Sequence, residues 1–353
     1  MTIVTIKDVA RAAGVSSATV SKVLTGNSPE YRVSRDTVER VRKAAEELGY
    51  VPNVSAQNLR SKRSGMIGVV LNEFDSSGRS MHLRLNSQMD SIQTVHLTFD
   101  GALLSGLTEA ARIHNTAFVV YPESTHPSED IAHRFLDGRV EGLILRTNPT
   151  IQHPLLTKLD PRRIKMMALW TQDVPPGVGY ADIDHKGGAA LATEHLLSLG
   201  HQKIAFFGPG EKSPNQHFSM RHQGYQNALK KAGLTPDERL HTEDPQTILS
   251  LFQNGEVTGV VGATDLQTIL LHSDLVQAGI RVPEDLSLVG FDNILGSEFI
   301  AGGLTTVHHP TQEMAAAAMN GLMGLIRGET VSRCRTVVPT HMVIRNTTRA
   351  LNP

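Results

Sequence analysis

The first 26 residues constrain the fold most, because they predict two short helices joined by a tight turn. Apolar side chains recur at helical spacing over Ile6–Ala13, and Thr5 can cap this helix. Gly14 permits the left-handed backbone that ends a helix, and Ser16 or Ser17 can cap a second helix. The pattern predicts a helix-turn-helix unit whose second helix can enter a DNA major groove. Taken alone, the segment also fits an ordinary helical hairpin.

A third helix is predicted over residues 35–48, because Ser34 can cap it, Leu48 can face inward and Gly49 can end it. Residues 1–64 carry eleven Lys or Arg against six Asp or Glu, a formal charge of +5. The whole chain has a net charge of −1, so residues 65–353 carry −6. A basic head of this kind binds the phosphate backbone with salt-sensitive affinity, and an acidic body is repelled by it.

From residue 66 onward, short apolar segments alternate with helical patterns. The apolar segments predict strands at residues 67–71, 117–121, 142–145, 165–169, 203–207, 259–262 and 286–290. The helical patterns cover residues 101–114, 186–199, 220–232, 266–278 and 311–327. This alternation predicts doubly wound parallel α/β sheets, in which a ligand lies beyond the C-terminal ends of the strands. At 353 residues, the chain is long enough for two such lobes after the small helical head.

Composition indicates the compartment. A single cysteine, Cys334, excludes an intrachain disulfide and favours a reducing environment. The N-terminus shows no secretory signal pattern, and no segment approaches the roughly 20 apolar residues of a membrane span. We therefore expect a cytoplasmic protein.

The helical head closely resembles the LacI/GalR family of bacterial transcription regulators. The likeness is carried by Thr5-Ile-Lys-Asp-Val-Ala, Ala13-Gly-Val-Ser, Ala18-Thr-Val-Ser, Val23-Leu, Leu48-Gly-Tyr-Val-Pro-Asn and Leu59-Arg. The resemblance implies that Ser17, Ala18 and Lys22 read bases in the major groove. It also implies phosphate contacts from a set of hydroxyl-bearing side chains, namely Thr5, Ser16, Thr19, Ser21 and Tyr50.

The same resemblance implies a hinge helix over residues 53–60 that folds in the minor groove. Its DNA contacts would be Asn53, Ala56, Leu59 and Arg60, with Leu59 wedged into a central base step. An apolar wedge beside basic residues is how minor-groove proteins kink DNA. The alternative for Leu59 is packing against the next domain. The loop over residues 25–33 is a few residues longer than is usual in the family.

The body resembles the effector domains of the same family, which share their fold with periplasmic sugar-binding proteins. The likeness is carried by Thr193-Glu-His-Leu-Leu-Ser-Leu-Gly-His, Arg221-His-Gln-Gly-Tyr, Val282-Pro-Glu-Asp-Leu-Ser-Leu-Val-Gly-Phe-Asp and Leu304-Thr-Thr-Val. The resemblance implies that Arg221, Asp265 and Asp292 contact an effector between two lobes. An arginine and two carboxylates suit a polyhydroxylated ligand, because they can make bidentate hydrogen bonds. A structural cap is the alternative for Asp292.

The first-lobe contacts are harder to place. Trp170, which ends a predicted strand, could stack on a sugar face or pack in the core. Residues 72–98 are inserted where the family has a short turn, well beyond an ordinary loop. Phe99 and Asp100 then stand at the predicted start of a helix, so we expect them to contact the effector.

These patterns predict residues 1–50 as the DNA-binding domain, 51–64 as hinge helix and linker, and 65–353 as the effector-binding and dimerisation domain. Within the last, lobe 1 would span about 65–180 and 309–335, and lobe 2 about 181–308 and 336–350. The predicted function is a sequence-specific transcription regulator, a repressor, controlled by a carbohydrate or other small molecule. It would bind a pseudo-palindromic operator as a homodimer. The alternative is a soluble sugar-binding protein without a role at DNA.

An enzyme is not expected. The sequence contains no nucleophile elbow, phosphate-binding loop, dinucleotide fingerprint or His-Glu-x-x-His motif. Its 16 histidines are scattered, and the adjacent pair His308-His309 is better explained as a surface pair than as a metal site. We therefore expect neither a cofactor nor a metal ion.

Overall fold

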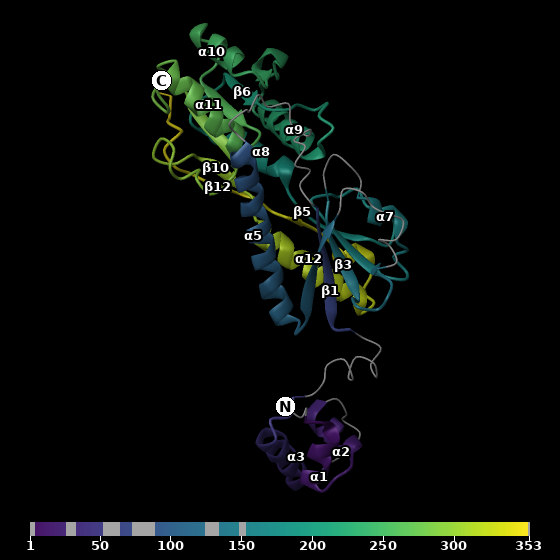
Figure 1. The fold of residues 1–353 in the computed structure, drawn as a ribbon. Coiled ribbons are helices and arrows are strands. Elements are labelled where there is room, and N and C mark those ends of the chain that lie inside the picture. The colour runs from purple at the N-terminus through teal and green to yellow at the C-terminus, as the bar shows by residue number, and fades with distance from the viewer. Residues whose placement is uncertain are drawn as a thin grey trace. The chain divides into compact units, whose positions relative to one another are not determined.

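The computed structural model of the chain describes residues 4–25, 33–51, 64–72, 89–123, 134–147 and 153–351. The chain divides into two compact units, Met1–Gly65 and Met66–Pro353, here called the headpiece and the body (Figure 1). The predicted hinge helix at residues 53–60 lies outside the described residues, as do residues 26–32 of the long loop.

The described part of the headpiece consists of α1 (Ile6–Ala13), α2 (Ser17–Thr25) and α3 (Arg35–Glu47). These helices pack small apolar side chains into one core, formed by Val9, Ala10, Ala13, Val20, Val41, Ala44 and Ala45. The predicted helix-turn-helix unit and third helix are therefore confirmed. Leu48 is an exception: it lies just past the end of α3 and is 38% exposed, so the prediction that it faces inward was wrong.

Local hydrogen bonds explain where the first two helices begin and end. The Asp8 carboxylate accepts hydrogen bonds from the backbone N–H of Thr5 at 3.0 Å and from its hydroxyl at 2.6 Å. Gly14 adopts a φ of 65° at the end of α1, where a side chain would be strained. The Ser16 hydroxyl then accepts the backbone N–H of Thr19 at 3.1 Å, so Ser16 caps α2.

The first sheet of the body has the strand order β11-β5-β4-β3-β1-β2, and its neighbouring strands all pair in parallel. Its strands are β1 (Met66–Asn72), β2 (Ala117–Glu123), β3 (Gly142–Arg146), β4 (Lys165–Leu169), β5 (Gly179–Ile183) and β11 (Arg335–Val338). Helix α5 (Met89–Ile113) packs along α12 (Thr311–Ile326), and α12 also contacts β3, β4 and β5. The short helices α7 (Pro154–Lys158) and η2 (Val331–Cys334) belong to the same lobe.

The second sheet has the order β12-β10-β9-β8-β6-β7 and is parallel except for β12, which pairs antiparallel to β10. Its strands are β6 (Ile204–Phe207), β7 (His241–Thr242), β8 (Gly259–Gly262), β9 (Ser287–Asp292), β10 (Thr306–His308) and β12 (His341–Val343). The accompanying helices are α8 (His185–Ser198), α9 (Gln216–Lys231), η1 (Glu238–Leu240), α10 (Pro245–Gln253) and α11 (Asp265–Gln277). The predicted strand–helix alternation is confirmed.

The lobe borders differ slightly from the expected ones. Strand β5 extends to Ile183 and β11 to Val338, and both lie in the first sheet. The chain therefore passes between the sheets after Ile183, after His308 and after Val338, rather than near residues 180 and 335. These strands were not predicted, because β5 carries a polar residue, Asp182, at a buried position and β11 alternates exposed with half-buried residues.

Helix α5 begins at Met89, twelve residues before the predicted start at Gly101. Phe99 and Asp100 consequently lie inside the helix rather than at its start, which corrects the prediction. Gly101 suggested a helix start, yet neither it nor Gly106 interrupts α5. At Gly106 the absence of a side chain has a packing reason, because a Cβ there would overlap the backbone of Gln312 on α12.

Candidate DNA-binding surface and effector site

Helix α2 presents a polar face that fits the predicted base-reading role. Ala18 and Lys22 are exposed and lie four residues apart, so they share one side of the helix. Ser17 and Ser21, half-buried, follow the same spacing beside them. Val20 is fully buried on the opposite side. The arrangement leaves small and basic side chains available to a groove while the apolar side holds the headpiece together.

The predicted phosphate contacts lie mainly where helices begin. Thr5 and Ser16 cap α1 and α2, and the hydroxyls of Ser16 and Thr19 are 2.9 Å apart. A helix N-terminus carries partial positive charge and outward N–H groups, which suits a phosphate. Tyr50 is half-buried and packs against the headpiece core. The four predicted hinge contacts, Asn53, Ala56, Leu59 and Arg60, lie outside the described residues.

In the body, functional side chains gather where strands of the first sheet end. Arg146 is the last residue of β3, and Trp170 directly follows β4. The Arg146 guanidinium lies 5.0 Å from the centre of the Trp170 ring and 3.0 Å from the Asp100 carboxylate. Phe99 packs edge-on against His309, with ring centres 5.1 Å apart. The structure thus brings the predicted first-lobe residues together through Arg146 and His309.

Trp170 is held more specifically than an ordinary core residue. Its indole N–H donates a hydrogen bond to Nε2 of His309 at 3.2 Å, and its backbone carbonyl accepts one from Nε2 of His217 at 3.0 Å. Its backbone has a φ of 58°, a left-handed conformation that is uncommon for a bulky residue. Only 8% of the residue is exposed. Backbone outliers held by their surroundings concentrate at functional sites, so this feature favours a ligand-related role.

The second lobe contributes a buried ion pair. The Arg221 guanidinium donates to Asp292 at 3.1 Å and to the backbone carbonyl of Ala263, and it lies 3.7 Å from the centre of the Phe291 ring. Burial raises the pKa of Asp292 to about 6, although the Arg221 charge opposes this shift. Asp292 also has a φ of 124°, a conformation that disfavours a side chain. The pair therefore combines a buried charge with a constrained backbone, as binding sites do.

Asp265 lies deeper in the body than an effector contact was expected to lie. It is fully buried, and its oxygens accept hydrogen bonds from the Thr306 hydroxyl and from the backbone N–H of Ile294 at 2.9 Å. Burial, reinforced by the charge of Asp292, raises the pKa of Asp265 to about 7. These contacts tie the chain after β9 to β10. In this conformation both oxygens of Asp265 hold the segments next to Asp292 in place.

Sequence reasoning missed four residues that link the two halves of this site, namely Asp182, His185, His217 and His309. His185 is fully buried, and its Nδ1 accepts the Nε–H of Arg221 at 3.3 Å. His309 is only 5% exposed, so its interpretation as a surface residue was wrong. It turns inward directly after β10, where the chain passes to the first lobe. His185 lies just after the end of β5, a position that is typical of ligand-binding residues in parallel sheets. This signal could not be used, because β5 was not predicted from the sequence.

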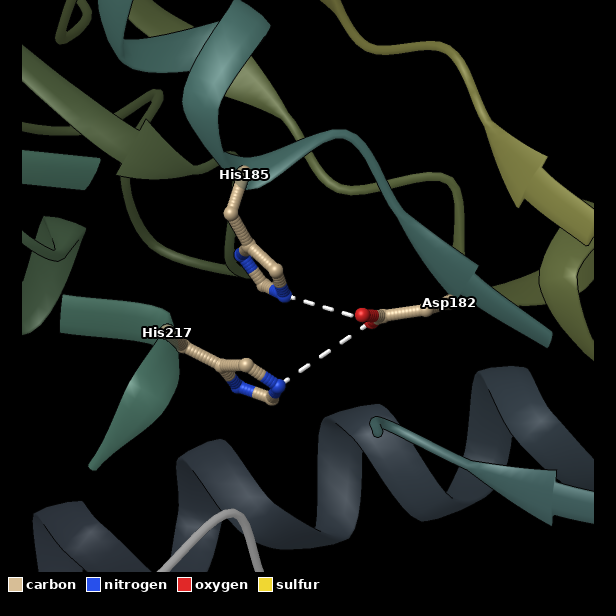
Figure 2. Close-up of side chains that lie close together, drawn as sticks. All are labelled: Asp182, His185 and His217. Carbon is tan, nitrogen blue, oxygen red and sulfur yellow. Dashed lines mark ion pairs between the residues drawn. The ribbon is translucent and has the colours of Figure 1, made fainter. Parts of the chain in front are cut away.

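The three buried histidines of this site have lowered pKa values. Burial holds the pKa of His185, His217 and His309 well below the usual range, and the nearby Arg221 charge acts in the same direction. The rings of His185 and His217 stack with centres 3.9 Å apart, and both direct Nε2 toward Asp182 (Figure 2).

The headpiece is a helix-turn-helix unit, and the body has two doubly wound sheets with polar residues gathered where these two sheets meet. Together these features define a DNA-binding regulator with a ligand-binding domain. Residues 5–53 match the family model "Bacterial regulatory proteins, lacI family", and residues 193–348 match "Periplasmic binding protein-like domain". The chain is 30% identical to the HTH-type transcriptional regulator DegA of Bacillus subtilis (strain 168), over 99% of each chain. The chain therefore belongs to the LacI family, whose members are transcription regulators and not enzymes.

Solved structures agree with this architecture. The transcriptional regulator CelR in complex with cellobiose is similar with a TM-score of 0.64 and 29% identity, over 98% of this chain and 99% of that one. The lac repressor dimer bound to operator and the anti-inducer ONPF shares the fold, with a TM-score of 0.68 and 24% identity over 99% and 100% of the two chains. Among the described residues, no helix is long and apolar enough to cross a membrane.

Proposed function

We propose that this regulator is a cytoplasmic repressor whose operator affinity is controlled by a carbohydrate bound between the lobes of the body. The observation that carries the proposal is the buried Arg221–Asp292 pair, joined through His185 and His217 to Trp170 in the other lobe. A guanidinium and a carboxylate can pair with neighbouring hydroxyls, while an indole can cover an apolar sugar face. The cellobiose complex of CelR, which has a similar fold, supports this class of ligand.

The proposed effector contacts are Phe99, Asp100, Trp170, Arg221 and Asp292, with Asp265 acting as a positioning residue. In the described conformation Trp170, Arg221 and Asp292 already make hydrogen bonds within the chain. An effector must therefore displace internal hydrogen bonds, such as the one between Arg221 and His185. Exchange of internal contacts for ligand contacts is a means of linking binding to a change between the lobes.

The headpiece and the hinge supply the proposed contacts with DNA. Ser17, Ala18 and Lys22 would read bases, and Thr5, Ser16, Thr19, Ser21 and Tyr50 would contact phosphates. Residues 51–64 would supply the hinge, with Asn53, Ala56, Leu59 and Arg60 in the minor groove. A homodimer formed through the bodies would place two headpieces on a pseudo-palindromic operator. A change between the lobes would alter the spacing of the two hinges and so the stability of the bound state.

The first test is selection of bound duplexes from a random DNA pool by the purified full-length chain. Enrichment of a palindrome supports the proposal and supplies a probe for effectors. Loss of affinity for this probe in the presence of a sugar, found by screening a sugar panel, identifies the effector. A protein that binds a sugar but enriches no DNA sequence would instead be a sugar-binding protein without a regulatory role.

The second test is Arg221→Lys, which preserves a positive charge beside Asp292 but removes the planar fork needed for bidentate contacts. We expect operator affinity without effector to be unchanged and the effector response to fall by at least about 10-fold, the size of one lost bidentate contact of about 1.4 kcal/mol. The matched control is Arg239→Lys, because Arg239 is 70% exposed in the same lobe. An Arg221→Lys variant with a normal response would refute this assignment.

A further inference from the structure

Asp182, His185 and His217 come from three separate elements, yet they lie together, and both imidazole rings face the Asp182 carboxylate (Figure 2). Asp182 lies on β5 of the first sheet, His185 begins α8, and His217 lies in the first turn of α9. We propose that these side chains bind a divalent transition-metal ion of the Zn²⁺ class at the junction of the two lobes. The site depends on no assumption about the effector.

The donor atoms and their spacing fit such an ion. Two imidazole nitrogens and one carboxylate oxygen form a donor set that zinc sites use when one coordination position remains open. One ligand atom from each residue lies within 4.8 Å of the others. Oδ1 of Asp182 lies 3.3 Å from Nε2 of His185 and 4.0 Å from Nε2 of His217. Ligand arms of about 2.0–2.1 Å place neighbouring donors about 3.3 Å apart in a tetrahedron, so only His217 has to move closer.

A second observation comes from His185. Its side chain is completely buried, and its Nε2 makes no hydrogen bond among the described residues. Oδ1 of Asp182 lies 3.3 Å from this nitrogen but forms no hydrogen bond with it. A buried polar atom without a partner is costly in a native structure and calls for a specific explanation. Coordination of an ion supplies one.

The positive charge next to the cluster is already compensated. Arg221 touches the cluster, because its Nε–H donates to Nδ1 of His185 at 3.3 Å. Its guanidinium also pairs with Asp292 at 3.1 Å, a carboxylate outside the donor set. Asp182 is therefore left to supply negative charge to an ion.

Ion binding would reorganise the effector site. On coordination, the ring proton of His185 moves from Nε2 to Nδ1, and Nδ1 can then no longer accept the Nε–H of Arg221. In the same way, Nε2 of His217 gives up its hydrogen bond to the Trp170 carbonyl. The ion thus competes with two contacts that hold Arg221 and Trp170 in place. Binding of the ion should change the environment of Trp170, which is the single tryptophan of the chain.

The experiment uses the full-length chain after treatment with a chelator and dialysis. Zn²⁺ is titrated by equilibrium dialysis, and Co²⁺ is then added as a spectroscopic probe. We expect saturable binding of one ion per chain, visible absorption from tetrahedral Co²⁺, and a change in Trp170 fluorescence that saturates with the same midpoint. No saturable binding, or bound ions without any change at Trp170, would refute the proposal.

The variants are Asp182→Asn, which keeps the size of the side chain, and His217→Gln. Each should weaken Zn²⁺ binding by more than about 100-fold, because loss of an outer hydrogen-bond partner of a ligand already costs 10–100-fold. The control is the double variant His308→Asn/His341→Asn, which removes another pair of neighbouring rings, 4.9 Å apart. It should bind normally. If it alone lost the ion, the site would lie there and the proposal would be wrong. Circular dichroism of each variant checks that it folds. The change in Trp170 fluorescence is measured on the unaltered chain and does not depend on the folding of any variant.

Discussion

Headpiece and body place the side chains proposed to contact DNA and effector in opposite surroundings. In the headpiece, Ala18 and Lys22 are exposed on α2, and the helix is held by a separate apolar face centred on Val20. In the body, Arg221 and Asp292 are buried against each other and against residues of the other lobe. A surface that reads another molecule can be specified by one helix. A site that responds to a ligand is built from internal contacts that the ligand must replace.

The largest expected effect is in the body. Arg221→Ala leaves Asp292 buried without its partner and should lower the free energy of unfolding of the body by about 3–5 kcal/mol. Urea unfolding followed by Trp170 fluorescence measures it. The control Arg239→Ala breaks exposed pairs with Asp237 and Glu256 and should cost less than about 1 kcal/mol. Equal losses from both variants would mean that the buried pair does not stabilise the body.

The next effect concerns the small core of the headpiece. Val9 is fully buried, and Val9→Ala should cost about 2 kcal/mol through lost burial and a small cavity. In a unit of this size that loss is a large part of the free energy of unfolding. The amides of α1–α3 should therefore exchange about 30-fold faster. Hydrogen exchange of the full chain measures this. The control is Val69→Ala on β1, because Val69 is as buried as Val9. This variant should leave the exchange rates of the headpiece amides unchanged. Faster exchange of the headpiece amides in this control would show that the two units do not unfold independently.

Lys22→Ala tests whether the exposed face of α2 reads sequence. If Lys22 contacts a base, the variant should lose about 1–3 kcal/mol of discrimination at one operator position. Selection from a random DNA pool, repeated with the variant, measures this. Lys43→Ala, on the exposed side of α3 near Glu47, serves as the control. A variant that keeps the sequence preference but shows a weaker salt dependence would place Lys22 on a phosphate.

The smallest effect is a difference in pH dependence. The pKa of His309 is held well below its usual value by burial, so the folded body binds fewer protons there than the unfolded chain does. Stability must therefore fall as the pH drops below about 6.5, the ordinary pKa of histidine. The headpiece sequence contains no histidine and should not show this loss.

The matched variant is His309→Gln, which can still accept from Trp170 and donate to Thr311. Thermal unfolding in the presence of a chelator, between pH 5 and pH 8, should show a shallower pH dependence for this variant. An unchanged slope would mean that His309 has the same pKa in the folded and unfolded states, which would contradict the prediction.

The headpiece was predictable because its structure depends on neighbours in the chain. The capping of α1 by Thr5 and Asp8, the left-handed Gly14 and the cap of α3 at Ser34 all involve residues within a few positions of one another. Most strands of the body were predictable for the same reason, since each is a continuous apolar run. Five strands were missed, namely β5, β7, β10, β11 and β12. Strands β7, β10 and β12 have only two or three residues, and Asp182 interrupts the apolar run of β5.

The amino-acid sequence by itself determined the family, the helix-turn-helix unit and the alternation of strands and helices, and it led to the proposal that Arg221 and Asp292 contact an effector. Tertiary structure alone decided which distant residues meet: Asp182 with His185 and His217, Trp170 with His309, and Asp100 with Arg146. The physical reason is the range of the interactions. Caps and periodic apolar faces act over a few residues, whereas a buried polar cluster exists only after separate segments have packed and excluded water around it.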